Sequence, residues 1–380
     1  MRLDDLKNPR TKNYSRIKYF LIQIERAIKQ FYYYLISILN INIFKNNKKR
    51  IFIGEYKDTR FIEFLFFSLS REYIFVYSNK KGLANFIKKI GVFNFFKYCK
   101  QGKLEKEDVS LLIDTKINSK DKNIVSIDTD YFFLTDNNIK YSNVVPYYIY
   151  PKTYKKIYNQ LNRYENNQKE FKIIFSGSTN KEIYNRLNWF DINNNKLLNR
   201  AEIIDIIESV FFDRIQIIKE KNSLGKEIDK SKIIFFKNEN KVNKKKALLS
   251  TEEHLEMISK SEFFLTAPGT EMPMCHHFIE AIKFGSIPIT NYGKLILPKI
   301  SKDLYLHYSS KNELIECINR AFKMNNEEKI EKANKLKEVY QKEFSPVSFL
   351  DKFNKMSLPT KIYVNNDHDS VRLREKRLKY

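Results

Sequence analysis

The chain has 380 residues, of which 42% are hydrophobic, including 30 Phe and 24 Tyr. This length predicts two domains, and this apolar content excludes a disordered chain because it is enough to bury sizeable cores. Lys and Arg outnumber Asp and Glu by 69 to 45, a formal net charge of +24. The charge favours anionic partners (nucleic acid, an anionic membrane face or a phosphorylated substrate) without choosing among them, and no zinc-ligand spacing or RNA-binding signature accompanies it.

We expect residues 1–48 to form an amphipathic helical segment ahead of the first domain. Residues 30–44 carry no charge, and 15 residues are too few for a membrane-spanning helix, which needs about 20. Aromatic residues between basic flanks are typical of a helix that lies on an anionic membrane surface. An equally supported alternative is that the aromatic face packs on the first domain.

The cysteine spacing and the N-terminal residues indicate the cellular compartment of the protein. Cys99, Cys275 and Cys317 show no paired spacing, which is typical of a reducing compartment, and the first residues lack the apolar core of a secretory signal. We therefore expect a cytoplasmic protein, peripheral on the inner face of the cytoplasmic membrane if residues 16–44 bind lipid.

Residues 49–150 alternate between strand and helix patterns, which predicts a Rossmann-like domain with a parallel sheet. Strands are expected at 50–54, 73–77, 109–114 and 123–127, and helices at 61–70 and 83–99. No Gly-x-Gly-x-x-Gly follows the first strand, so a dinucleotide cofactor is disfavoured. Asp128 and Asp130 resemble a metal-binding pair, but this spacing is common in loops and we expect no metal there.

A second domain is expected over residues 151–345, after an extended, proline-bracketed linker at 144–151. Its first strand, 171–175, runs into Ser176, Gly177 and Ser178. A strand followed by a small-residue loop and a helix is a generic phosphate cradle. Arg186 and Arg200 are the nearby basic residues expected to reach an anion.

Residues 259–290 are the most informative stretch. An apolar strand at 263–265 ends at a Pro-Gly loop, a helix follows Pro273 and stops at Gly285, and a second strand occupies 287–290. This is a parallel crossover unit, and ligands bind beyond the carboxyl ends of such strands. The loop 266–275, which includes Thr270, and the start of its helix therefore predict an anion site.

Two histidines precede Glu280 in this helix. His277 lies three residues and His276 four residues before it, so each can share the face of Glu280. A metal site made of all three is improbable because adjacent residues diverge by about 100° around a helix. We therefore predict no metal.

The segment Glu280-Ala281-x-x-x-Gly285-x-Ile287-Pro288-Ile289 resembles the E-A-L-x-x-G-x-I-P-V segment of GT-B glycosyltransferases, most closely the exostosin-like group. The small-residue loop after residue 175 is a second point of similarity. The resemblance implies an α/β fold of two Rossmann-like domains, an acceptor domain at 49–150 and a nucleotide-sugar donor domain at 151–345. It further implies that 346–380 holds a helix that returns to the first domain, followed by a basic tail.

The resemblance also implies roles for residues. Glu280 would hold the ribose of the nucleotide-sugar, and the other donor-binding candidates are Ser176, Gly177, Ser178, Arg186, Thr270, His276 and His277. The chain has His277 where the family usually carries Arg, and Met272 where many retaining enzymes carry Glu. The missing Glu indicates an inverting enzyme, which needs a base for the acceptor hydroxyl, and Glu55 and Asp58 after the first strand are the candidates.

The sequence thus predicts an inverting, metal-independent glycosyltransferase that transfers a sugar from a nucleotide-sugar to a cell-surface glycan or lipid-linked acceptor, as in polysaccharide or lipopolysaccharide synthesis. The nucleotide-sugar is its co-substrate, no other cofactor is expected, and no specific nucleic acid is expected as a partner. One alternative is a non-catalytic basic protein that binds nucleic acid or anionic membrane. Another is a nucleotide-sugar hydrolase or epimerase of similar fold.

Overall fold

A computed structural model describes most of the chain from residue 49 to residue 364. The described residues are 28, 49–53, 61–77, 87, 90, 92–101, 103, 106, 108–113, 123–128, 144–150, 153–154, 158–191, 195–219, 228–238, 248–270 and 272–364. The expected N-terminal segment, apart from residue 28, and both candidate bases, Glu55 and Asp58, lie outside them. The chain divides into two compact units, residues 1–128 with 356–362 and residues 129–355 with 363–380.

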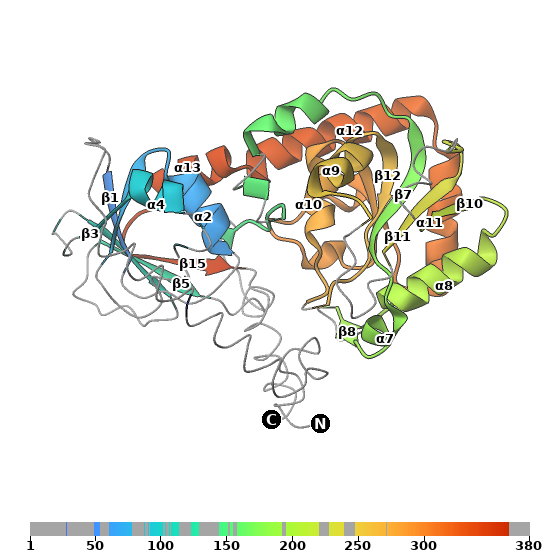
Figure 1. The fold of residues 1–380 in the computed structure, drawn as a ribbon, viewed down its shortest axis with the longest axis horizontal. Helices are drawn as coiled ribbons and strands as arrows, with labels where there is room; N and C mark the ends of the chain where they lie inside the picture. The colour runs from blue at the N-terminus through green and yellow to red at the C-terminus, as the bar shows by residue number, and fades with distance from the viewer. Residues whose placement is uncertain are drawn as a thin grey trace. The chain divides into compact units, whose positions relative to one another are not determined.

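Within the described residues, the first sheet has seven strands in the order β3-β2-β1-β4-β5-β15-β6. The strands are β1 (Lys49–Ile53), β2 (Tyr73–Tyr77), β3 (Cys99–Gln101), β4 (Val109–Ile113), β5 (Ile124–Asp128), β6 (Val144–Val145) and β15 (Thr360–Val364). The registered pairs are parallel. All five residues of β2, YIFVY, are buried, as expected of a strand covered on both faces. Helices α2 (Phe61–Leu69) and α4 (Val92–Tyr98) belong to the same part of the chain (Figure 1).

The part of the second sheet that the structure describes has six strands in the order β10-β11-β7-β12-β13-β14, also with parallel pairs. Its strands are β7 (Phe171–Ser178), β10 (Ile215–Ile218), β11 (Ile233–Asn238), β12 (Ser261–Leu265), β13 (Ile287–Thr290) and β14 (Leu306–His307). A separate antiparallel pair joins β8 (Trp189–Phe190) to β9 (Lys196–Leu197). The two parallel sheets confirm the predicted α/β class and are compatible with two Rossmann-like domains.

Helices cover both faces of the second sheet. In Figure 1 this sheet runs between α9 (Thr251–Ser259) and α10 (His276–Lys283) on one side and α8 (Arg200–Val210) and α11 (Lys311–Lys323) on the other. The remaining helical elements are η3 (Tyr158–Tyr164), α7 (Lys181–Tyr184), η5 (Gly293–Leu295), η6 (Lys302–Leu304), α12 (Asn326–Val339), η7 (Tyr340–Phe344) and α13 (Pro346–Asn354). No helix in the described part of the chain has the length and apolar character that a bilayer span requires.

Capping boxes begin two of the helices on the second sheet, α8 and α9. Ser250 accepts a hydrogen bond from the Glu253 N–H while the Glu253 carboxylate accepts one from the Ser250 N–H, a capping box at the start of α9. Asn199 and Glu202 form the same box at the start of α8. These local bonds set the points at which α8 and α9 leave the sheet.

The predicted crossover unit is confirmed. Strand β12 ends at Leu265, α10 spans His276–Lys283 and β13 pairs in parallel with β12. Gly285 lies just past the helix with a φ of 64°, a left-handed conformation that favours glycine. Its N–H donates to the Ile282 carbonyl at 3.2 Å and the Ser286 N–H to the Ala281 carbonyl at 2.9 Å, the two bonds of a Schellman motif.

Candidate functional site

A pocket of about 200 Å³ opens at the carboxyl end of β7. It is lined by the end of β7, by β11, by the start of α9, by α10 and by the extended segment before residue 151. The lining residues are Tyr150, Ser176, Gly177, Phe236, Leu248, Leu249, Ser250, Thr251, His254, His277 and Glu280. This is the edge at which parallel sheets bind ligands.

Glu280 is the buried charge in this wall. Its side chain is only 1% exposed. Oε1 accepts a hydrogen bond from the Tyr150 N–H at 3.1 Å, and Oε2 lies 3.4 Å from Nε2 of His254. Neither Oε2 nor that Nε2 has a hydrogen-bond partner among the described residues. One carboxylate oxygen is thus held by a backbone N–H, and the other faces the His254 imidazole at a long distance.

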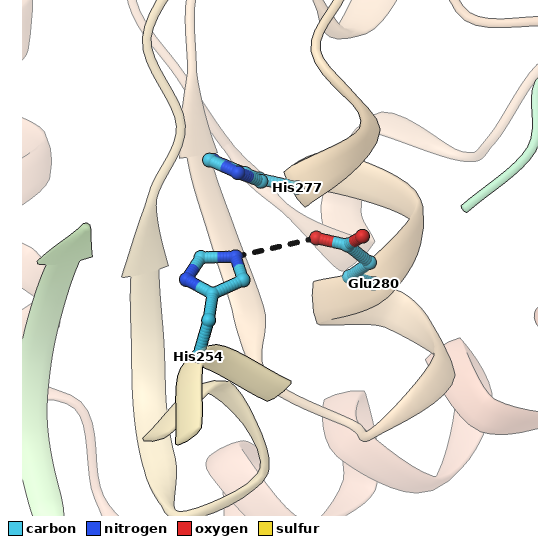
Figure 2. Close-up of side chains that lie close together, drawn as sticks. All are labelled: His254, His277 and Glu280. Atoms are coloured by element: carbon cyan, nitrogen blue, oxygen red, sulfur yellow. Dashed lines mark ion pairs between the residues drawn. The ribbon is translucent and has the colours of Figure 1, made fainter. Parts of the chain in front are cut away.

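Three side chains from two helices converge here. Figure 2 shows His254 of α9 facing His277 and Glu280 of α10. The imidazole centroids of His254 and His277 lie 4.4 Å apart, and the Phe264 ring meets both edge-on. One ligand atom from each of the three side chains lies within 4.8 Å of the others. We call these three residues the His-His-Glu cluster.

Burial and mutual contact set the charges of the cluster. Burial would raise the pKa of Glu280, but the adjacent imidazole of His254 and the nearby His277 and His276 outweigh it and lower the pKa to about 2. Burial lowers the pKa of His254 and of His277, against the opposing effect of Glu280. Near neutral pH the cluster therefore holds an ionised carboxylate and two neutral imidazoles. Such a set can accept hydrogen bonds from ligand hydroxyls or bind a divalent cation.

The structure brings four of the predicted donor-binding residues together: Ser176, Gly177, His277 and Glu280 line the pocket. Ser178 ends β7 without lining it, and Thr270 lies in the loop before α10. Arg186 is exposed after α7 and does not line the pocket.

His276 points away from the pocket. Its Nδ1 lies 2.8 Å from the Tyr148 carbonyl oxygen, and its ring stacks on Tyr147 with centroids 5.2 Å apart. Adjacent histidines therefore diverge around α10 as the helical geometry predicts, with His277 on the side of Glu280. His276 holds the 147–148 segment against the helix.

Arg200 is a structural residue rather than a free cation. It is 5% exposed and donates to the carbonyl oxygens of Ala267, Pro268 and Ser178 at 3.1 to 3.2 Å. It also donates to the Tyr184 hydroxyl at 2.8 Å and lies over that ring. Arg200 thereby ties the loop after β12 to the end of β7.

His254 is the site residue that the sequence analysis missed. It lies in α9, 23 residues ahead of His277. Its signal is weak, since one histidine on an amphipathic helix is usually unremarkable. The packing of α9 beside α10 is what places it against Glu280.

No protein-family model matches the chain, and no curated protein matches it. Among solved structures, the chain is similar to the N-terminal domain of a trehalose-6-phosphate phosphatase from Candida albicans. The identity is 11%, the match covers 90% of this chain and 75% of that chain, and the TM-score is 0.34. A similarity at this level does not bear on function.

Proposed function

We propose that the chain is a GT-B glycosyltransferase of the exostosin-like type that transfers a sugar from a nucleotide-sugar to a glycan or lipid-linked acceptor. The observation that carries the proposal is Glu280, an ionised carboxylate in the pocket wall with one oxygen lacking a hydrogen-bond partner among the described residues. It stands in the motif where the resemblance expects a contact to the donor ribose. Two parallel sheets and a pocket at a strand's carboxyl end are consistent with that role.

The second sheet would bind the donor. Its pocket is small for a whole nucleotide-sugar, so we expect it to take the part of the donor nearest Glu280. Negative charge develops on the departing diphosphate, and backbone N–H groups at the start of α10 are suited to stabilise it. Glu55 or Asp58 stays the predicted base for the acceptor hydroxyl, and the reaction would invert the sugar.

Thermal unfolding with a panel of UDP, GDP, CMP and their sugars, with and without Mg²⁺, tests the proposal. A ligand that binds only the folded chain at 100 times its Kd adds about 2.7 kcal/mol of stability. We expect one nucleotide class to raise the melting temperature, and the rise to vanish in Glu280→Gln. The exposed Glu327→Gln on α12 is the matched control and should respond like the natural chain.

The two alternatives give different results in the same assay. If heparin or DNA shifts the melting temperature in a salt-sensitive way and no nucleotide does, the chain is a basic binding protein and the transferase proposal fails. Turnover of a nucleotide-sugar without any acceptor would instead indicate a hydrolase or epimerase.

A further inference from the structure

We infer that His254, His277 and Glu280 form a site for one divalent transition-metal ion of the zinc class. Two imidazole nitrogens and one carboxylate oxygen are a ligand set that Zn²⁺ takes when a fourth position stays open. His277 and Glu280 are three residues apart on α10 and share one face, and α9 supplies the third ligand (Figure 2). Imidazole ligands favour transition metals over Mg²⁺.

The distances are close to those of an assembled site. Ligand atoms bound at 2.0–2.2 Å to a tetrahedral ion lie about 3.4 Å apart. His254 Nε2 and Glu280 Oε2 are 3.4 Å apart, so one edge of the tetrahedron is already present. The ligand atoms of all three residues lie within 4.8 Å of one another. Closing the remaining edges would shorten each separation by about 1.4 Å at most.

The two nearest atoms are also the ones that need a partner. Buried polar atoms are nearly always satisfied, yet within the described residues His254 Nε2 and Glu280 Oε2 have only each other, at a long 3.4 Å. An ion between them would satisfy both.

The surroundings supply a second layer of contacts and an open side. The Tyr150 N–H holds Glu280 Oε1 and so fixes the carboxylate with Oε2 toward the imidazoles, the kind of outer contact that orients metal ligands. Ser176, Ser250 and Thr251 line the adjoining pocket of about 200 Å³. That space accommodates a water or ligand oxygen in the fourth position.

This inference goes beyond the proposed function and replaces the expectation that the chain binds no metal. The ion would bind Oε2 of Glu280, the oxygen that the resemblance assigns to a ribose hydroxyl. A ribose oxygen of the nucleotide-sugar would then bind the ion and not Glu280 directly. Metal affinity is measured without nucleotide or acceptor and does not depend on sugar transfer.

Isothermal titration of the untagged, EDTA-stripped full chain with Zn²⁺ tests the inference. We expect one ion per chain and no comparable binding of Mg²⁺. His254→Gln and His277→Gln should each weaken binding by more than the roughly 10- to 100-fold typical of losing an outer contact. His307→Gln is the matched control, because His307 lies on β14 outside the cluster, and should bind like the natural chain.

Co²⁺ gives a second readout. Its visible absorption should show a low-coordinate ion in the natural chain and in His307→Gln, and not in the two cluster variants. Absence of stoichiometric Zn²⁺ binding to the natural chain overturns the inference even if the variants misfold. Equal affinity in folded cluster variants also overturns it.

The two proposals fail separately. Metal binding without any nucleotide-induced stabilisation would support the metal site and contradict the transferase proposal. Nucleotide-induced stabilisation of a chain that binds no Zn²⁺ would support the transferase proposal and contradict the metal site.

Discussion

Three buried charged side chains around the second sheet meet the cost of burial in different ways. Lys283 is 4% exposed and pairs with Glu165, its Nζ 2.6 Å from Oε1; burial lowers the pKa of Lys283 and Glu165 opposes that shift. The Arg200 guanidinium donates hydrogen bonds to three carbonyl oxygens and one hydroxyl. Glu280 has one backbone donor and two imidazoles beside it. Because buried polar atoms are nearly always satisfied, Oε2 of Glu280, which has no hydrogen-bond partner among the described residues, is where a ligand is expected.

Removing Arg200 should destabilise the fold. Arg200→Ala leaves the Ala267, Pro268 and Ser178 carbonyls without this donor, and an unsatisfied buried group costs about 1–3 kcal/mol. We expect a loss of about 2–4 kcal/mol in urea unfolding. Arg186→Ala, at an exposed position, should stay within about 0.5 kcal/mol. Equal losses in the two variants would contradict a structural role for Arg200.

The end of α10 shows how one backbone conformation positions an element. Gly285 closes the helix in the left-handed region and returns the chain at once to β13. A Cβ there would lie 2.9 Å from the Ala333 carbonyl oxygen and 2.8 Å from Lys337 Cε, so the glycine also lets α12 approach closely. The cluster residues on α10 depend on this close packing.

Gly285→Ala should therefore cost about 1–3 kcal/mol, from the left-handed backbone and from the contact with the fixed Ala333 carbonyl. Denaturant unfolding measures the loss. Glu327→Ala, on the exposed start of α12, is the comparison and should change stability by about 0.5 kcal/mol or less. A neutral Gly285→Ala would show that α10 and α12 can shift apart freely.

At the scale of the whole molecule, the chain returns late to its first sheet. After α13, strand β15 takes a place between β5 and β6, and it pairs in parallel with β6 through Tyr363↔Val144 and Val364↔Val145. Ile362 of this strand is fully buried. The first sheet is thus completed by residues more than 200 positions downstream of β6.

Truncation tests this arrangement. A chain ending at Lys355 lacks β15, and a chain ending at Val364 keeps it. Hydrogen exchange monitored by mass spectrometry should show faster exchange of β5 and β6 amides in the shorter chain only, because their strand neighbour is gone. Unchanged protection in the shorter chain would mean that β15 contributes nothing to the sheet.

Much of the fold was predictable because its signals are local. Apolar runs of strand length and glycine after a helix act through bonds between residues a few positions apart, so β2, the start of β7, β12 and the end of α10 lie where the pattern predicts. The loop predicted at Ser176–Ser178 was wrong, because these residues pair with β11 and form the end of β7. The pairing of His277 with the face of Glu280 is local as well, since it follows from helical spacing. The resemblance of the 280–289 segment is read from the same short range.

The sequence by itself therefore determined the α/β class, the crossover unit around residues 261–290 and two of the three cluster residues, His277 and Glu280. Only the tertiary structure decided that His254 completes it, that Tyr150, 130 residues before Glu280, orients its carboxylate, and that Arg200 is occupied by carbonyls 67 and 68 residues away. These contacts join separate elements, and they depend on strand order and helix packing. Local periodicity encodes neither, because it records which face of an element is buried and not what that face meets.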